Sequence, residues 1–566
     1  MATSMKTHQI ISKVKSKFVG KDASLRPFRL LRQDVAKFFQ RWPSDWTIFN
    51  SVVLASSVFI FFTNLLPGIT FASELYALTG QNWGTVEIIL STGLCNITFS
   101  LFGLQPLTVL GVTGSFTVIA EHLYNLVTES FGVPFLPFMA WSLIHTCWML
   151  WLLATFNAHE WTSKSNMDYL TVIYLTDFTC QIFSLLNSII YFNKALQEFR
   201  RGHREMPFEA FLYSVIDGVG TFLLALLLSS AEKWKVFPRW LRTVLRQYAT
   251  AIAVIFFVAI GYAGEAAQLD KARLSTSSDR FAPSNPERST FFVEFWTLSP
   301  DRIAVAMLPG MIITMLFFFD HEISTIICTS RRFGIRKPSG LTMEMFLLGI
   351  TTALCGILGI PPANGLLPQA PLHSESLLHI EVEEIDGLEH PMPRVYEQRW
   401  SKLIHGGAIM ACIAPPLQLV LGFTPTSVLA GLFMFMGQQS LCSNPIFERT
   451  LNMFTPISQL PALPSGIPSY WPLHGYTICQ IVITVVVFIV TLTIAGPAFP
   501  VIIIALVPLR LLLMPKMWSR EVLRYLDKWS CKDGTPEDGD EEKIDDCVIE
   551  YTPTRPLIPS LVLGAV

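Results

Sequence analysis

One acidic residue lies in an otherwise apolar run. Asp320 follows four apolar residues in the run Leu316–Thr325, and a charged side chain inside a membrane span costs enough free energy to imply a role. Protonated, its carboxyl group donates a hydrogen bond; ionised, it pairs with a cation that moves together with a substrate. We therefore interpret Asp320 as a substrate-binding or coupling carboxylate. The structural alternative is a carboxylate held by neighbouring backbone N–H groups.

Two segments that combine Pro and Gly with polar residues interrupt the helical pattern at corresponding places in the two halves of the chain. They are Gln105–Ser115 and Gly359–Ser374. Non-helical backbone at membrane depth is tolerated only where protein or a watery cavity satisfies its hydrogen bonds. Paired interruptions of this kind point to the binding site of a transporter. The alternative is that Pro and Gly only kink packed helices.

A short helix is expected after each interruption, so that two helix N-termini with free backbone N–H groups converge near the middle of the membrane. Such helix ends carry partial positive charge and bind anions. The residues that we expect to bind the substrate, besides Asp320, are Gln105, Gly111, Thr113, Gly114, Ser115, Leu367 and Gln369.

Other ionisable residues in or near the spans are interpreted as structural. Glu322 is the exception: it lies two residues after Asp320 and therefore on a different helical face, and both a structural and a functional role stay open for it. Hydrogen bonding between helices is the expected role of Glu87, Glu121, His122, Asp177 and Asp217. Metal binding is not expected from His373, Glu375, His379 and Glu381, because their spacing straddles the end of a short span. No cofactor is expected, and no nucleophile–base pair indicates an enzyme.

The composition indicates an all-α polytopic membrane protein. Of 566 residues, 51% are hydrophobic and 15% charged, and the mean hydropathy is +0.45, whereas a soluble domain carries about 25% charged residues. The apolar residues form blocks near the roughly 20 residues that a helix needs to cross the hydrocarbon. They predict about fourteen crossings, among them Tyr169–Phe192 and two short ones at Val112–Val127 and Leu366–Leu378. The net charge of −2 gives no sign of a nucleic-acid partner.

The predicted organisation has five parts. They are a basic cytosolic tail (1–45), a first group of seven spans (46–262), an external loop (263–300), a second group of seven spans (301–513) and a cytosolic C-terminal part (514–566). The last part holds an amphipathic helix at Lys516–Trp529 and an acidic tail at Asp533–Asp546. A mixed-charge loop from Glu381 to Lys402 is expected in the cytosol. The even number of crossings and the basic clusters place both termini there.

The chain resembles the family of bicarbonate and borate transporters, which includes animal chloride/bicarbonate exchangers and plant and fungal borate exporters. The motifs that carry the resemblance are Thr85–Thr92, Gln105–Leu107, Gln181–Ser184, Phe319–His321 and Gly359–Pro362. The resemblance extends from Trp46 to Trp518. It implies two inverted seven-span repeats, a core domain that slides against a gate domain, and a homodimer joined through the gates. It places Asp320 and both interrupted segments in the core.

Within that family, the run Gly359–Leu377 resembles the borate-exporter version. Animal exchangers carry an arginine where this chain has Gln369, and boric acid or tetrahedral borate wants many polar partners rather than one point charge. The resemblance therefore implies a secondary active exporter of borate or boric acid in the plasma membrane, coupled to H⁺ or Na⁺. Two alternatives stay open: a bicarbonate or chloride exchanger on the same fold, and a channel with a continuous pore.

Overall fold

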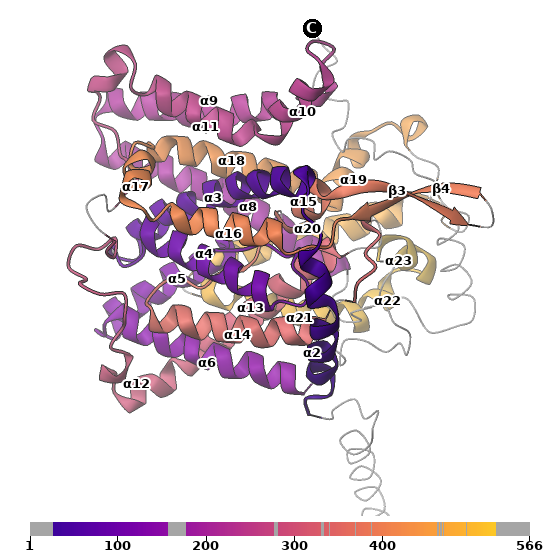
Figure 1. The fold of residues 1–566 in the computed structure, drawn as a ribbon, viewed down its shortest axis with the longest axis horizontal. Helices are drawn as coiled ribbons and strands as arrows, with labels where there is room; N and C mark the ends of the chain where they lie inside the picture. The colour runs from indigo at the N-terminus through magenta and orange to yellow at the C-terminus, as the bar shows by residue number, and fades with distance from the viewer. Residues whose placement is uncertain are drawn as a thin grey trace, which may run out of the picture. The chain divides into compact units, whose positions relative to one another are not determined.

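The computed structural model shows a predominantly helical chain (Figure 1). It describes residues 27–156, 177–276, 281–329, 333–338, 340–367, 369–385, 388–460, 463, 467, 469–493 and 495–527. Three of the sequence predictions lie wholly or partly outside these residues. They are the first part of the basic tail, the first part of the crossing Tyr169–Phe192, and the acidic tail Asp533–Asp546.

The described residues form two compact units. The first comprises those within Met1–Trp161 and Tyr191–Phe435, and the second those within Thr162–Ile190 and Met436–Val566. The predicted groups of spans at 46–262 and 301–513 follow the order of the sequence, whereas the two compact units are defined by packing. The predicted groups therefore stay a prediction.

The helices of the first unit include those that carry every residue of the candidate site. They are α2 (Arg29–Arg41), α3 (Ser51–Leu78), α4 (Thr85–Phe102), α5 (Gly114–Asn125), α6 (Phe135–Thr155), α9 (Phe208–Ser229), α10 (Arg239–Gln247), α11 (Ala249–Ile260), α12 (Pro300–Val305), α13 (Met307–Cys328), α14 (Leu341–Ile357), α15 (Gln369–Ser376), α16 (Trp400–Ala411) and α17 (Pro415–Gly422). Two more, α8 (Asp177–Glu205) and α18 (Thr426–Cys442), continue from one unit into the other. The second unit also holds α19 (Pro445–Phe454), α20 (Trp471–Thr491), α21 (Phe499–Leu512), α22 (Met514–Met517) and α23 (Arg520–Leu526).

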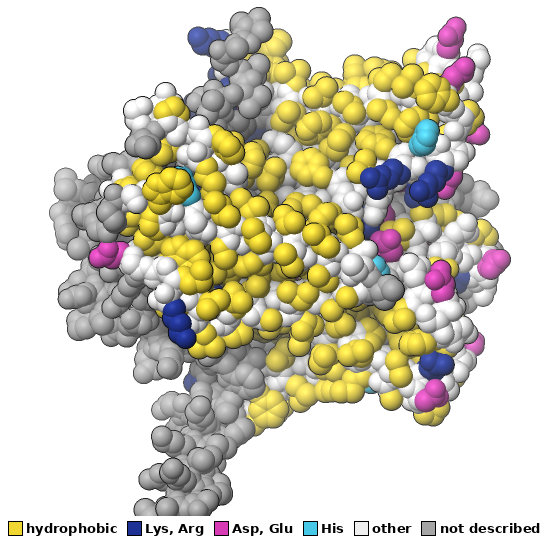
Figure 2. Space-filling model, turned by 180° about the vertical axis from the view of Figure 1, so that it is seen from behind, with side chains coloured by type: hydrophobic (Ala, Val, Ile, Leu, Met, Phe, Trp, Pro, Cys, Tyr) yellow, Lys and Arg dark blue, Asp and Glu magenta, His cyan; other side chains and the backbone are white. Residues whose placement is uncertain are grey.

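Six of the described helices are long and apolar enough to cross a membrane, or eight if each of two sharply bent helix pairs counts as one span. The predicted count of fourteen stays a prediction. Helix α9 shows the polarity that lipid requires, because it buries Ser214, Asp217 and Thr221 and exposes Ile216 and Leu223. Figure 2 likewise shows hydrophobic side chains covering the middle of the visible face, with charged side chains near its margins.

Two predicted short crossings contain helices that are too short to cross alone. Helix α5 has 12 residues and α15 has 8, which at 1.5 Å per residue gives about 18 Å and about 12 Å. The hydrocarbon core is about 30 Å thick. Each of the two helices follows a two-residue strand: β1 (Leu110–Gly111) precedes α5, and β2 (Asn364–Gly365) precedes α15.

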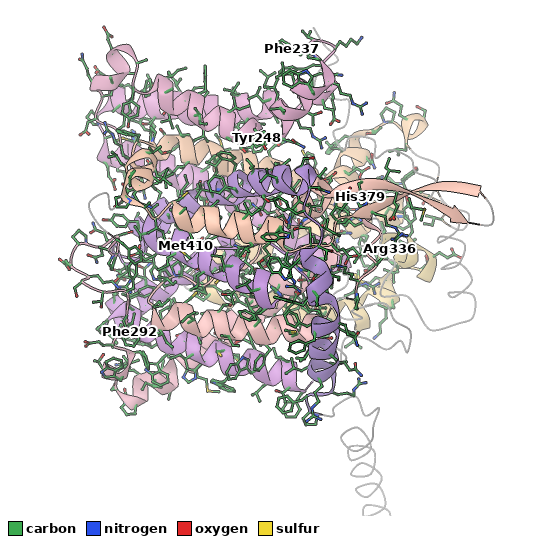
Figure 3. All side chains as sticks on the ribbon, in the orientation of Figure 1. Phe237, Tyr248, Phe292, Arg336, His379 and Met410 are labelled. Atoms are coloured by element: carbon green, nitrogen blue, oxygen red, sulfur yellow. The ribbon has the colours of Figure 1, made fainter. Side chains whose placement is uncertain are left out.

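Two groups of three helices surround these strands. Helices α3, α4 and α16 pack against one another, and α6 packs against both α13 and α14 (Figure 1). Close packing of the first group depends on small residues: a Cβ atom at Gly93 of α4 would lie 3.1 Å from Cβ of Met410 on α16 (Figure 3). Strand β1 contacts α4, and β2 contacts α13. The interrupted segments therefore lie between two packed helical layers.

Two predictions about surface segments need correction. Most of the expected loop Glu381–Lys402 belongs to an antiparallel hairpin of β3 (Leu378–Ile385) and β4 (Leu388–Val395) and to the start of α16. The ring of His379 on β3 stacks on Tyr396 at 3.8 Å (Figure 3). The expected amphipathic helix Lys516–Trp529 is broken into α22 and α23, because Trp518 and Ser519 are extended between them. The basic tail contains α2, whose Asp34 and Phe38 are buried.

Candidate functional site

The two interrupted segments pair with each other. Leu110 lies opposite Gly365 and Gly111 opposite Asn364 in an antiparallel ladder, and the Leu366 N–H donates to the Val109 carbonyl at 2.9 Å. Backbone that leaves the helical pattern is thereby satisfied by its counterpart from the other half of the chain. Since α5 and α15 begin a few residues after the two strands, both helix N-termini start from this one short ladder.

Two asparagines from neighbouring helices hold β1. The side-chain amides of Asn64 on α3 and Asn96 on α4 donate to the Leu110 carbonyl at 2.9 and 2.7 Å. The Leu110 N–H donates to Oδ1 of Asn96 at 3.1 Å. Asn64 also contacts Nε2 of His405 on α16 at 3.0 Å. These bonds fix the strand in the one register that the packed layers leave for it.

We expect Asn96→Leu to destabilise the protein, because the Leu110 N–H and C=O would both lose a buried partner. An unsatisfied buried polar group costs about 1–3 kcal/mol, so the Tm of the purified protein in detergent should fall by several degrees. Asn64→Leu should lower it less, since Asn96 still bonds both backbone groups of Leu110. Equal Tm values for Asn96→Leu and the unmodified protein would show that these bonds do not hold the strand.

Asp320 lies beside this ladder and is 1% exposed. The side chains of Thr113, which caps α5, and Asn364, on β2, interact with its carboxylate. Among the described residues, no backbone N–H group and no side chain donates a hydrogen bond of full geometry to either carboxylate oxygen. The alternative interpretation of Asp320, a carboxylate held by backbone N–H groups, therefore has no support in the structure.

The other predicted site residues divide into two groups. Gly111 lies on β1, while Thr113, Gly114 and Ser115 form the start of α5. Leu367 and Gln369 lie at the start of α15, where Oε1 of the buried Gln369 side chain has no hydrogen-bond partner among the described residues. Gln105, which opens the first segment, donates its backbone N–H to Glu344 Oε1 at 2.7 Å.

Glycine is required where the segments cross other parts of the chain. A Cβ at Gly111 would come within 2.8 Å of a Leu366 methyl group and 2.9 Å of Asn64 Oδ1. A Cβ at Gly365 would lie 2.0 Å from Oγ of Ser324 and 3.2 Å from Cα of His321, both on α13. The ladder thus packs directly on the helix that carries Asp320.

A cavity of about 630 Å³ is lined mainly by residues of α3, α8 and α18. Phe433 lines it and also packs against Phe71 and Tyr191, with ring centroids 5.3 and 6.4 Å apart. Tyr191 is close enough to Asp320 for the two to interact electrostatically, and a Cβ at Gly114 would meet its ring at 3.2 Å. The three aromatic side chains therefore lie between the cavity and the start of α5.

The cavity wall carries charges of both signs. Nζ of Lys194 lies 2.5 Å from a carboxylate oxygen of Glu74 and 3.1 Å from one of Glu121. Sequence reasoning assigned Glu121 to hydrogen bonding between helices, and its contact with Lys194 on α8 agrees with that role. Asp217 is confirmed in the same role by its 3.1 Å hydrogen bond from Ser427. Glu87 instead accepts from the backbone N–H groups of Gly84 and Ser284.

A buried ion network lies at the other end of the first interrupted segment. Asp45 accepts from Arg41 and Arg399 at 3.0 Å each and from Lys337 at 2.6 Å. Arg399 also donates to the Gly103 carbonyl at 2.7 Å, just before the segment begins. Burial raises the pKa of the neighbouring Glu397 carboxyl, although Arg41 and Lys337 oppose the shift. This network anchors the start of the segment.

His373 has a structural role instead of the metal-binding one that we discounted. Its Nδ1 contacts the Leu107 carbonyl at 2.7 Å, and its Nε2 contacts Ser401 Oγ at 2.8 Å. No group of three His, Cys, Asp or Glu side chains suited to a metal ion occurs within the part of the chain that the structure describes.

Sequence comparison places the chain among known transporters. The family described as the HCO3⁻ transporter integral membrane domain matches residues 26–211 and 203–530. A putative transporter of Schizosaccharomyces pombe is 31% identical over 505 residues, covering 88% of this chain and 95% of that protein. Boron transporter 1 of Saccharomyces cerevisiae is 30% identical over 425 residues, covering 73% of this chain and 70% of that protein.

Structure comparison supports the fold. The transmembrane domain of the cyanobacterial bicarbonate transporter BicA matches with a TM-score of 0.51 at 14% sequence identity, covering 78% of this chain and 98% of that domain. At so low an identity, this similarity concerns the fold alone. The chain therefore has the fold of a membrane transporter.

Proposed function

The chain belongs to the HCO3⁻ transporter integral membrane domain family, and from that membership we propose that it is a secondary active transporter that exports borate or boric acid by alternating access. The observation that carries the proposal is the ladder between the two interrupted segments, with Asp320 beside it. A pair of broken helices at corresponding positions marks a transporter's binding site. Boron transporter 1 of Saccharomyces cerevisiae, 30% identical, supports boron as the substrate.

The unpaired groups of the site favour a substrate rich in hydroxyl groups. Among the described residues, Oδ1 of Asn364 and Oε1 of Gln369 are buried acceptors without a donor, and the buried Asp320 carboxyl group interacts with the Thr113 and Asn364 side chains without a hydrogen bond of full geometry. Boric acid offers three O–H donors, and its oxygens can accept from the N–H groups at the start of α5 and α15. Chloride offers no donor at all. We therefore place boric acid or borate between the two helix N-termini, with Asp320 ordering or coupling the site.

The remaining parts of the proposal come from the family. The chain forms two inverted seven-span repeats, and its core, with both interrupted segments, moves past a gate domain to open the site to each side in turn. Two copies associate through their gates in the plasma membrane, with all termini in the cytosol. Movement of H⁺ or Na⁺ drives the export.

The second candidate function is exchange of bicarbonate or chloride, since the family takes its description from HCO3⁻. Purified protein in proteoliposomes separates the two. We expect boron efflux that saturates with concentration and exceeds the efflux from protein-free liposomes, and no faster exchange of chloride or bicarbonate than in those liposomes. Exchange of chloride or bicarbonate without boron efflux would select the second candidate. Single-channel currents would instead indicate a pore.

A further inference from the structure

A second group of buried polar side chains lies on α13, α14 and α16, next to the candidate substrate site. Glu344 on α14 contacts Nε2 of His321 at 3.2 Å and the Thr325 hydroxyl at 3.2 Å, in addition to the backbone N–H of Gln105. Lys402 on α16 interacts electrostatically with Glu344 and lies 5.0 Å over the ring of Phe99. We call Glu344, His321, Lys402 and Gln105 the inner cluster. All four side chains are 0% exposed.

The inner cluster is incompletely paired. Among the described residues, Nζ of Lys402, Nδ1 of His321 and both polar atoms of the Gln105 amide have no hydrogen-bond partner. Buried polar groups without partners are costly, and ionisable groups inside a membrane protein that are retained at such a cost are functional by default. Apolar side chains in this region would avoid that free-energy cost. The unpaired buried atoms therefore favour a small ligand at the inner cluster.

A proton meets that requirement. The Nε2 atom of His321 faces a carboxylate at 3.2 Å, so it donates the hydrogen bond and leaves Nδ1 vacant in the neutral ring. Adding a proton at Nδ1 turns the contact into an ion pair, which is stronger than the neutral hydrogen bond.

The inner cluster is connected to the substrate site in two ways. His321 follows Asp320 directly on α13, and its Cα is the backbone atom that Gly365 of β2 packs against. Glu344 holds the backbone of Gln105, where the first interrupted segment begins, at 2.7 Å. A change in the charge of Glu344 or His321 alters the strength of this hold. Occupancy of the inner cluster is thereby linked to the shape of the ladder.

On the premise of the proposed function, we propose that Glu344 and His321, with Lys402, form the binding site for the proton that is coupled to boron export, separate from the substrate site at Asp320. Among the described residues, five other titratable groups interact with Glu344 or Lys402. They are Cys95 of α4, Cys328 of α13, His373 of α15, Arg399 before α16 and His405 of α16.

Two transport measurements on one preparation test the proposal. Proteoliposomes loaded with ¹⁰B boric acid are placed in ¹¹B boric acid at equal concentration and pH, which reports isotope exchange without net proton movement. In parallel, net boron efflux is measured with and without an imposed pH gradient. We expect Glu344→Gln to retain exchange within about twofold, since Gln keeps an acceptor for the Gln105 N–H. Its net efflux should no longer respond to the pH gradient, whereas that of the unmodified protein should change several-fold.

Asp217→Asn is the matched control, because it removes a buried carboxylate on α9 that bonds Ser427 and lies outside both interrupted segments. It should keep the response to pH. The proposal is overturned if Glu344→Gln responds to the pH gradient as the unmodified protein does, if it loses isotope exchange although it elutes as a folded protein, or if a Na⁺ gradient replaces the pH gradient as the driving force. Absence of any boron flux in the unmodified protein would instead refute the proposed function.

Discussion

Asp320→Asn is expected to reduce boron export by about tenfold or more. The substitution keeps the size of the side chain but removes the ionisable group and one of the two carboxyl oxygens, beside the Thr113 and Asn364 side chains that interact with it. Hydrogen bonds to charged groups contribute about 1.5–3 kcal/mol, and a substrate that donates O–H groups loses this contribution. Cells loaded with boric acid should then retain as much boron as cells that lack the chain.

The control for this variant is again Asp217→Asn, whose carboxylate lies on α9 and bonds Ser427. It should export boron at the rate of the unmodified protein. Equal amounts of all three proteins in the membrane fraction must be verified by immunoblotting. If Asp320→Asn exports as fast as the unmodified protein, Asp320 neither binds the substrate nor couples its movement.

Gly365→Ala is the second substitution with a large expected effect. The new Cβ would lie 2.0 Å from Ser324 Oγ and 3.2 Å from His321 Cα, so either the ladder or α13 must shift. Overpacking of a close-packed interior costs about 1–3 kcal/mol. We expect a lower Tm in detergent and a loss of export greater than the loss of protein, because the strand register that places Asn364 near Asp320 is disturbed.

Two further variants separate this steric effect from a general intolerance of substitution. A Cβ at Gly407 on α16 meets no atom within 4 Å, so Gly407→Ala should leave the Tm and export unchanged. Ser324→Ala removes the nearest obstacle, and the double variant Gly365→Ala/Ser324→Ala should recover part of the lost Tm. A Gly365→Ala protein with unchanged Tm and export would show that the ladder does not need this close contact.

Several residues of the candidate site could be predicted from the sequence, because their residue types are rare inside membrane spans. A carboxylate in an apolar run and two Pro- and Gly-containing interruptions are expensive in a membrane, and the structure brings Asp320, Thr113 and Gly114 to the same ladder. The resemblance to a family explains why this prediction extended to a substrate class. Local sequence alone could not indicate which strand pairs with which, since the two segments are separated by more than half of the membrane part of the chain.

The residues that support the site were missed for a physical reason. Asn64, Asn96 and Glu344 contact backbone groups that lie far away in the sequence, so no spacing rule reveals them. Gln105 was assigned to the substrate site because it opens an interrupted segment. Its backbone N–H donates to Glu344, and its role in substrate binding stays a prediction. Polar residues inside apolar helices, such as Asn64, were the available signal, because membrane interiors retain such groups only for a purpose.

The β3–β4 hairpin was missed because the charged composition of the segment was given more weight than its local turn sequence. The run Glu381–Lys402 was interpreted as a loop from its mixed charge, although Asp386-Gly387 between two alternating stretches is a hairpin signature. The short helices α5 and α15 lie within two predicted crossings, because hydropathy does not distinguish a short helix that starts from a buried strand from one that spans the membrane alone. The count of fourteen crossings stays a prediction.

The most direct test of the proposed function is the boron content of cells that lack their own boron exporter, with and without this chain, after loading with boric acid at two external pH values. We predict that cells with the chain retain less boron at both pH values, and that the size of the difference changes with external pH because the export is coupled to an ion. Equal boron contents with and without the chain at both pH values, with the protein present in the plasma membrane, would contradict boron export.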